Sequence, residues 1–187
     1  MIEYRIRNNG EFSAKIGELA AMLEHTRTIT LKEVMDLGEE ELDALVAEES
    51  NSVGALLRHI AAIEYVHQVI TFEDRDLHES ELDRWKMALE LGEGARKTIH
   101  NHTIQEYINE LAEVREKTLS TFKKLQDEWL FKEKQSPNGI WINHYYLWYH
   151  VMEDEISHRG QIRMIKRMLK NRIYPDFQRN ENSDCES

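Results

Sequence analysis

The sequence has a single cysteine among 187 residues, and that residue, Cys185, lies in a polar C-terminal segment. One cysteine can form neither an intrachain disulfide nor a cysteine metal cluster. A reactive thiol also needs a fixed electropositive environment, which the polar residues 180–187 do not offer. If the protein carries out thiol chemistry, we therefore expect the thiol to arrive on a cosubstrate.

Residues that break helices are scarce, with 2 prolines and 8 glycines in the whole chain. Such a composition favours long helices over strands and tight turns. No apolar run approaches the ~18 residues that a membrane span needs. The first residues, Met-Ile-Glu-Tyr-Arg, lack the apolar core of a signal peptide. We therefore expect a cytoplasmic protein with no membrane partner.

Basic residues are fewer than acidic ones: the chain has 24 Lys and Arg against 35 Asp and Glu, and its formal net charge is −11. An excess of negative charge repels phosphate backbones and anionic lipid surfaces, so we expect no nucleic acid partner. Apolar residues make up 41% of the chain, which is the range of a folded globular protein. The length suits one domain, which we place at residues 1–173, with a flexible polar tail at 174–187.

Apolar residues recur at helical spacing in four long segments. The predicted long helices cover residues 10–27, 53–72, 104–125 and 143–171, with Ser52 and Thr103 as the capping residues of the second and third. Shorter helical pieces are predicted at 38–47 and 79–91, and a turn at 136–139. Since two of the connections are long, we predict an all-α four-helix bundle with long crossover connections, in which 73–104 covers one end.

The core stripe of the last predicted helix is interrupted by polar residues. Its heptad positions carry Leu147, Val151, Asp154, His158, Gln161, Ile165 and Met168. Asp154 and His158 are one turn apart on one face, and His59 lies on the apolar stripe of the second helix. Two histidines and a carboxylate suit zinc, nickel or ferrous iron with one coordination position left open. The same spacing also fits a buried hydrogen-bonded His–Asp pair without metal.

A second metal pattern competes with the first. Glu64-x-x-His67 and Glu155-x-x-His158 form two Glu-x-x-His pairs on the second and fourth helices. Di-iron carboxylate bundles use this pattern together with one further glutamate from each of the other two helices. The further glutamates would come from the following residues: Glu18 or Glu24, and Glu110 or Glu113. Because acidic residues are abundant here, chance pairs of this kind are also expected.

Two motifs resemble a known family. Residues 51–64, Asn-Ser-Val-Gly-x-Leu-Leu-x-His-Ile-Ala-x-x-Glu, resemble the second-helix signature of the DinB/YfiT-like superfamily. Residues 150–162, His-Val-Met-Glu-Asp-Glu-Ile-Ser-His-Arg-Gly-Gln-Ile, resemble its last-helix signature. The segments 72–76 and 89–93 also look like one DinB subfamily, so the likeness extends over nearly the whole chain.

The resemblance implies a four-helix bundle, often a homodimer, that holds one divalent metal ion on three side chains. The first ligand of the family falls on His59 and the third on His158, while the middle ligand, histidine in many members and glutamate in some, falls on Asp154. Because aspartate is shorter, Glu155 and Glu153 are alternative carboxylate ligands. The resemblance leaves two further roles open: His150 as a supporting or fourth group, and Arg159 as the partner of an acidic cosubstrate or of a neighbouring carboxylate.

Several members of the family are transferases or isomerases that use bacillithiol, mycothiol or glutathione. The resemblance therefore implies a metal-dependent S-transferase with a low-molecular-weight thiol cosubstrate and a small electrophilic substrate. A metal-activated water that hydrolyses an amide or ester is the second possibility. A metal-stabilised bundle with a binding role is the third. We further expect Tyr146, Trp148 and Tyr149 to pack in the core and in grooves, with a substrate box as the alternative, and Gly160 to make a close backbone contact beside the site.

Overall fold

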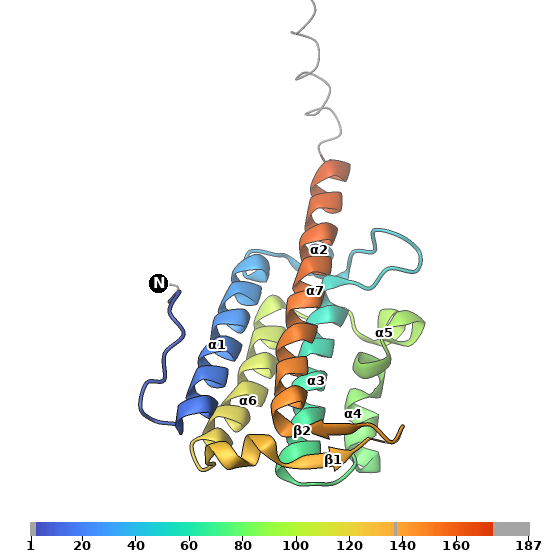
Figure 1. Cartoon of the computed structure of the whole chain (residues 1–187). Helices are drawn as coiled ribbons and strands as arrows, with labels where there is room; N and C mark the ends of the chain where they lie inside the picture. The colour runs from blue at the N-terminus through green and yellow to red at the C-terminus, as the bar shows by residue number, and fades with distance from the viewer. Residues whose placement is uncertain (1–2, 137, 174–187) are drawn as a thin grey trace, which may run out of the picture.

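The computed structural model describes residues 3–136 and 138–173, and its four long helices form a bundle (Figure 1). Their bounds are α1 Ala14–Val34, α3 Val53–Phe72, α6 Ile104–Phe122 and α7 His144–Ile173. Helix α1 packs against α6 and α7, and α3 packs against the same two helices on the opposite side. Helices α1 and α3 therefore occupy diagonal corners of the bundle, as do α6 and α7.

The connections cross the bundle because consecutive long helices do not always lie side by side. The chain from α1 to the diagonal α3 carries α2, Glu39–Asp43. The chain from α6 to the diagonal α7 carries the 3-10 helix η1, Asp127–Phe131, and the strands β1, Glu133–Gln135, and β2, Trp141–Asn143. This arrangement confirms the predicted all-α bundle with long crossovers. The sequence did not reveal the antiparallel hairpin, since strands of three residues are too short to show an alternating pattern.

The predicted starts of α3 and α6 agree with the structure, whereas the first long helix, predicted at 10–27, differs at both ends. Ser52 accepts a hydrogen bond from the amide of Ala55 at 3.2 Å, and Thr103 forms a capping box with Glu106. Helix α1 begins at Ala14 and continues to Val34, seven residues beyond the predicted end at residue 27. The β-branched run 28–30 weakens the helical signal there, but burial of Val34 in the core outweighs that propensity.

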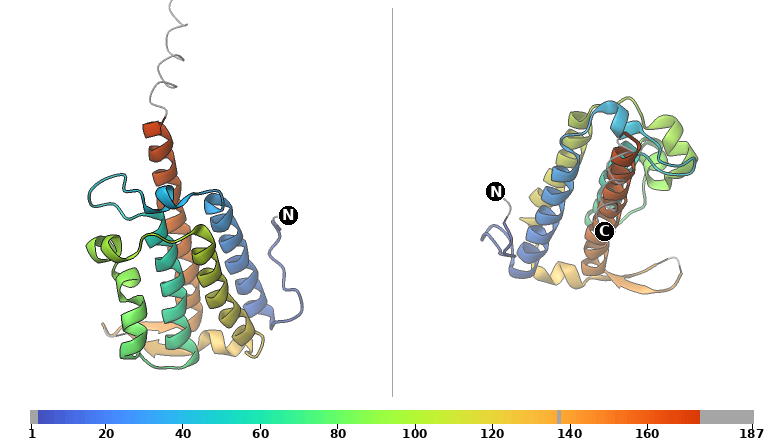
Figure 2. Two further views of the ribbon diagram at one scale, coloured as in Figure 1. Left: turned by 180° about the vertical axis from the view of Figure 1, so that it is seen from behind. Right: turned by 90° about the horizontal axis from the view of Figure 1, so that it is seen from above.

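The segment between α3 and α6 lies along the side of the bundle, and our prediction that it covers one end was wrong. It forms α4, Glu79–Glu90, and α5, Gly92–Thr98, and α4 packs lengthwise on α3 (Figure 2). Trp85 of α4 is fully buried, and its ring lies 5.3 Å from that of Tyr65 on α3. The apolar residues of this segment therefore supply a second layer over the outer face of α3.

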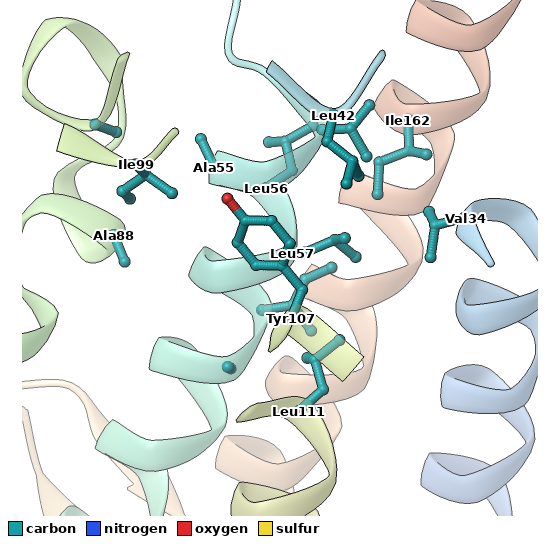
Figure 3. Packing of buried hydrophobic residues seen from close by; sticks show 14 of the residues in the cluster. Val34, Leu42, Ala55, Leu56, Leu57, Ala88, Ile99, Tyr107, Leu111 and Ile162 are labelled. Atoms are coloured by element: carbon teal, nitrogen blue, oxygen red, sulfur yellow. The ribbon is translucent and has the colours of Figure 1, made fainter. Parts of the chain in front are cut away.

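The apolar core consists of two clusters at different heights of the bundle. One cluster joins α2, α3, α4, α5 and α6 to the second half of α7, and Figure 3 shows part of it, with Leu56 and Leu57 near Tyr107 and Ile162. The other cluster packs Trp148 of α7 against Phe122 and the apolar side of α1. Burial of this much apolar surface is the main stabilising contribution to the fold.

A layer of buried charge crosses the middle of the bundle, and each long helix contributes one member. Glu64 of α3 accepts hydrogen bonds from Arg115 Nε of α6 at 2.7 Å and from Arg27 Nη2 of α1 at 3.0 Å. Arg27 Nε also donates to Glu155 of α7 at 3.0 Å. We call Arg27, Glu64, Arg115 and Glu155 the charge layer; all four are buried. Two positive and two negative charges balance within it, which offsets part of the cost of removing them from water.

Among the described residues, no helix is both long enough and apolar enough to cross a membrane. The predicted tail, residues 174–187, lies outside the described residues, as does Cys185.

Removing the negative charge of Glu64 should strongly destabilise the protein. In Glu64→Gln, the two buried arginines would keep only Glu155 within the charge layer and the half-exposed Glu24 at its edge, a loss of about 3–5 kcal/mol in the free energy of unfolding at neutral pH. Urea denaturation followed by circular dichroism measures it. Glu116→Gln, at an exposed position on α6, is the matched control and should change stability by less than about 0.5 kcal/mol. Equal stability of the two variants would contradict the role assigned to the charge layer.

The contribution of Glu64 should also disappear in acid. Burial raises the pKa of this carboxyl, but Arg115 and Arg27 outweigh burial and lower its pKa from 4.5 to about 2. Because the pKa is lower in the folded state, the stabilisation is present above pH 4.5 and is lost as the pH falls towards about 2. The difference in unfolding free energy between the parent and Glu64→Gln should therefore shrink over that interval. A difference that stays constant down to pH 2 would refute the assignment.

Candidate metal centre

Three side chains that are distant in sequence meet between α3 and α7. Asp154 Oδ1 lies 3.5 Å from His59 Nε2 and 3.4 Å from His158 Nε2. The two imidazole rings are 4.6 Å apart between centroids, in an edge-to-face arrangement. Among the described residues, these three form the one group of His, Cys, Asp or Glu side chains with possible ligand atoms that all lie within 4.8 Å of one another. The structure thus brings together the three residues singled out by the sequence.

In both histidines of this triad, the Nδ1 atom lies close to an oxygen acceptor outside the triad. His59 Nδ1 lies 2.8 Å from the carbonyl oxygen of Ala88 on α4, and His158 Nδ1 lies 3.3 Å from Gln161 Oε1, one turn further along α7. An acceptor at Nδ1 places the proton of the neutral ring there and leaves the Nε2 lone pair directed at the triad. Metal-ligating histidines have this type of support.

The donor set and its spacing fit a divalent cation. The distances of 3.4 and 3.5 Å exceed the 2.7–3.2 Å usual for N–H···O hydrogen bonds. Two ligand atoms that are each about 2.1 Å from a tetrahedral cation would stand roughly 3.4 Å apart. The second oxygen of Asp154, Oδ2, is buried and has no hydrogen-bond partner in the structure. A cation among these atoms would satisfy polar groups that the triad leaves unsatisfied.

Electrostatics keep the carboxylate of the triad ionised. Burial raises the pKa of Asp154, but the imidazoles of His158 and His59 outweigh burial and hold that pKa well below its usual range. Burial lowers the pKa of His158, and the Asp154 carboxylate more than reverses that effect, so the pKa of His158 is raised. A proton on His158 competes with a metal ion for Nε2, and metal binding by this triad is therefore linked to proton release.

The alternative carboxylates face other partners. Glu155 points into the bundle and pairs with Arg27 in the charge layer, while Glu153 is exposed and lies 3.5 Å from His150. Glu64, the other glutamate of a Glu-x-x-His pair, is also bound by arginines. Since both Glu-x-x-His glutamates neutralise arginines, the geometry disfavours the di-metal interpretation. Of the three neighbouring carboxylates, Asp154 alone belongs to the triad.

The expected close contact at Gly160 is absent, and the contacts of Arg159 and His150 lie outside the triad. Arg159 forms no ion pair within the described residues and donates to the carbonyl oxygen of Thr26 on α1 at 3.1 Å, while its pairing with an acidic cosubstrate stays a prediction. Gly160 makes no close contact, since no heavy atom lies within 4 Å of the position that a Cβ would take. His150 lies beside His67, with ring centroids 5.7 Å apart, and is not a member of the triad.

The aromatic residues at the start of α7 divide between core and surface. Trp148 is fully buried as predicted, and its Nε1 donates to Thr71 Oγ1 at 3.1 Å. Tyr146 and Tyr149 are exposed, and so is Met168, which the heptad pattern had placed in the core.

Sequence reasoning also missed Ala88 as a partner of His59, because a backbone carbonyl carries no residue-specific signal. Gln161 stood on the predicted polar stripe, but only the structure shows that it supports His158.

Comparison with known proteins agrees with this architecture. A family model described as mycothiol-S-transferase matches residues 18–170. A conserved protein from Enterococcus faecalis, known as a crystal structure, is 18% identical with a TM-score of 0.65, covering 82% of this chain and 95% of that one. A crystal structure from Streptococcus pneumoniae is 17% identical with a TM-score of 0.63, covering 82% and 91%. At such identity these structures show a shared fold. No curated protein sequence matches the chain.

The family model spans α3, the crossover segments and most of α7, so the match includes the helices that carry the triad. It agrees with the resemblance of residues 51–64 and 150–162 to the two DinB/YfiT-like signatures. With the bundle topology and the triad in place, the chain belongs to the mycothiol-S-transferase family of DinB/YfiT-like proteins.

Proposed function

We propose that this protein is a metal-dependent S-transferase that joins a low-molecular-weight thiol to a small electrophile. His59, Asp154 and His158 would hold one divalent cation, zinc, nickel or ferrous iron. The observation that carries the proposal is the triad itself, with two supported Nε2 atoms and a carboxylate at tetrahedral spacing, in a chain of the mycothiol-S-transferase family. Mycothiol, bacillithiol and glutathione are the cosubstrates to test.

The chemistry follows from the donor set. A cation bound by two neutral imidazoles and one carboxylate keeps positive charge and an open position, and would lower the pKa of a thiol that binds there. The reaction would form one carbon–sulfur bond, and the thiol proton would leave together with the leaving group of the electrophile. Since the one cysteine, Cys185, lies in a polar segment that lacks the electropositive setting of a reactive thiol, the proposal takes the sulfur nucleophile from the cosubstrate.

Each residue of the site has a distinct part in this scheme. The Ala88 carbonyl and Gln161 hold His59 and His158 in the tautomer that can bind a cation. Asp154 contributes one negative charge, and its low pKa keeps it ionised throughout the neutral range. The proposal requires a small-molecule substrate and neither nucleic acid nor membrane, in keeping with a net charge of −11. A cytoplasmic thiol pool would supply the cosubstrate, consistent with the location predicted from the sequence.

Two other functions remain distinguishable by experiment. The same cation could activate water for hydrolysis of an amide or ester, and such a reaction would need no added thiol. A bundle that uses the cation only for stability would bind it without any turnover. A requirement for thiol therefore separates the transferase from both.

The metal content of variants tests the ligand set. The parent, purified without chelator or histidine tag, should contain close to one equivalent of a divalent metal by elemental mass spectrometry. His158→Ala and Asp154→Asn should lose nearly all of it, because two remaining ligands bind a cation weakly. Glu153→Gln is the matched control, since this neighbouring carboxylate is exposed and lies outside the triad. Two equivalents in the parent, or full metal content in Asp154→Asn, would overturn the assignment.

Activity should depend on both metal and thiol. With a small electrophile such as monochlorobimane, conjugation should require one of the three candidate thiols, stop on removal of the metal and return on reloading. His59→Ala should reduce the metal-dependent rate by at least about a hundredfold. Hydrolysis without thiol would favour the second function. Absence of turnover with every thiol, in a protein that holds its metal, would favour the structural role.

A further inference from the structure

The solvent face of α7 carries an apolar stripe along most of the helix. Tyr149, Ile156, Met164 and Met168 are 45%, 43%, 55% and 38% exposed. Their spacing of seven, eight and four residues places them on one side of the helix. Figure 1 views the molecule from the side of α7, which lies in front of α3. Exposed apolar side chains that share one helix face are candidates for an interaction site, whereas apolar residues scattered singly over a surface are not.

Gly160 lies at the middle of this face, in the interior of a helix of 30 residues. Glycine destabilises a helix interior relative to alanine, so its presence calls for a structural reason. Within the described chain there is none, because no heavy atom lies within 4 Å of the place of a Cβ. The remaining use of a glycine here is to let another backbone approach closely from outside.

The side chains around Gly160 are arranged symmetrically. Ile156 and Met164 lie four residues before and after it, and Glu153 and Arg167 lie seven residues before and after it. Glu153 and Arg167 are exposed, and Arg167 has no ion-pair partner in the part of the chain that the structure describes. A helix face that is apolar near its centre, with an acid on one side and a base on the other, is complementary to its own antiparallel copy.

We propose that residues Tyr149, Glu153, Ile156, Gly160, Met164, Arg167 and Met168, here called the α7 stripe, form the interface of a homodimer. Two copies would cross at Gly160 about a twofold axis, with their α7 helices antiparallel. Ile156 then packs on Met164 of the partner subunit, and Glu153 pairs with Arg167 of the partner subunit. The family resemblance implies a dimer but indicates no surface; the assignment of the surface and its register rests on the features of α7 and is independent of the metal.

The register can be tested by mixing two charge variants of the full chain. Glu153→Arg alone places like charges opposite each other twice per dimer, and so does Arg167→Glu alone. Each should weaken self-association by at least about tenfold in analytical ultracentrifugation. An equimolar mixture of the two variants should form a heterodimer about as tight as the parent dimer, because both crossed pairs regain opposite charges. Glu18→Arg, the same charge change at an exposed position on α1, is the matched control and should leave association unchanged.

A second variant tests the close approach at the centre. Gly160→Leu should also weaken the dimer by at least about tenfold, since the added side chain keeps the two helices apart. All these positions are exposed, so the circular dichroism spectrum and melting temperature should confirm that each variant is folded. A monomeric parent at every concentration would overturn the proposal. A dimer that survives both single charge variants, or a mixture that fails to associate, would overturn the surface or its register.

Discussion

The charge layer is the constraint on which the arrangement of the bundle depends. Two arginines and two glutamates, one from each long helix, are buried together at mid-height. A buried charge without a partner is far more costly than a misplaced apolar side chain, so each helix must present its charged residue to the others. Because a helix is rigid, this requirement sets the rotation and the height of all four helices at once.

The rotation of α7 then decides the position of the triad. Glu155 points inward to Arg27, and its neighbour Asp154 is turned by about 100° around the helix, towards α3. His158 lies one turn further along the same flank, opposite His59. The layer that stabilises the core and the triad that could bind a cation are therefore built from adjacent residues. A substitution in one is expected to affect the other through the orientation of α7.

The differences between prediction and structure have physical causes. The heptad pattern identified Asp154 and His158 but also placed Met168 in the core, whereas α7 turns Ile165 and Leu169 towards the core and leaves Met168 on its solvent face. The segment 73–104 carries buried apolar residues such as Trp85 and Ala88 because α4 covers the side of α3. The spacing of apolar residues in the sequence does not show whether a helix covers a side or an end of the bundle. For Arg159 the sequence suggested an acidic cosubstrate or a neighbouring carboxylate. The structure shows a hydrogen bond to the carbonyl oxygen of Thr26 on α1, and a backbone carbonyl leaves no signal in the residue type.

The sequence by itself determined the helical class, the long connections, the capped starts of α3 and α6, and the three residues of the triad. These features depend on the spacing and chemistry of residues near one another in the sequence, and on motifs that resemble those of a family. Only the tertiary structure decided that Glu64 and Glu155 bind arginines, that Ala88 supports His59, and that Gly160 faces solvent. Each of these depends on how one helix is rotated against another, and that rotation is set by contacts between residues distant in sequence.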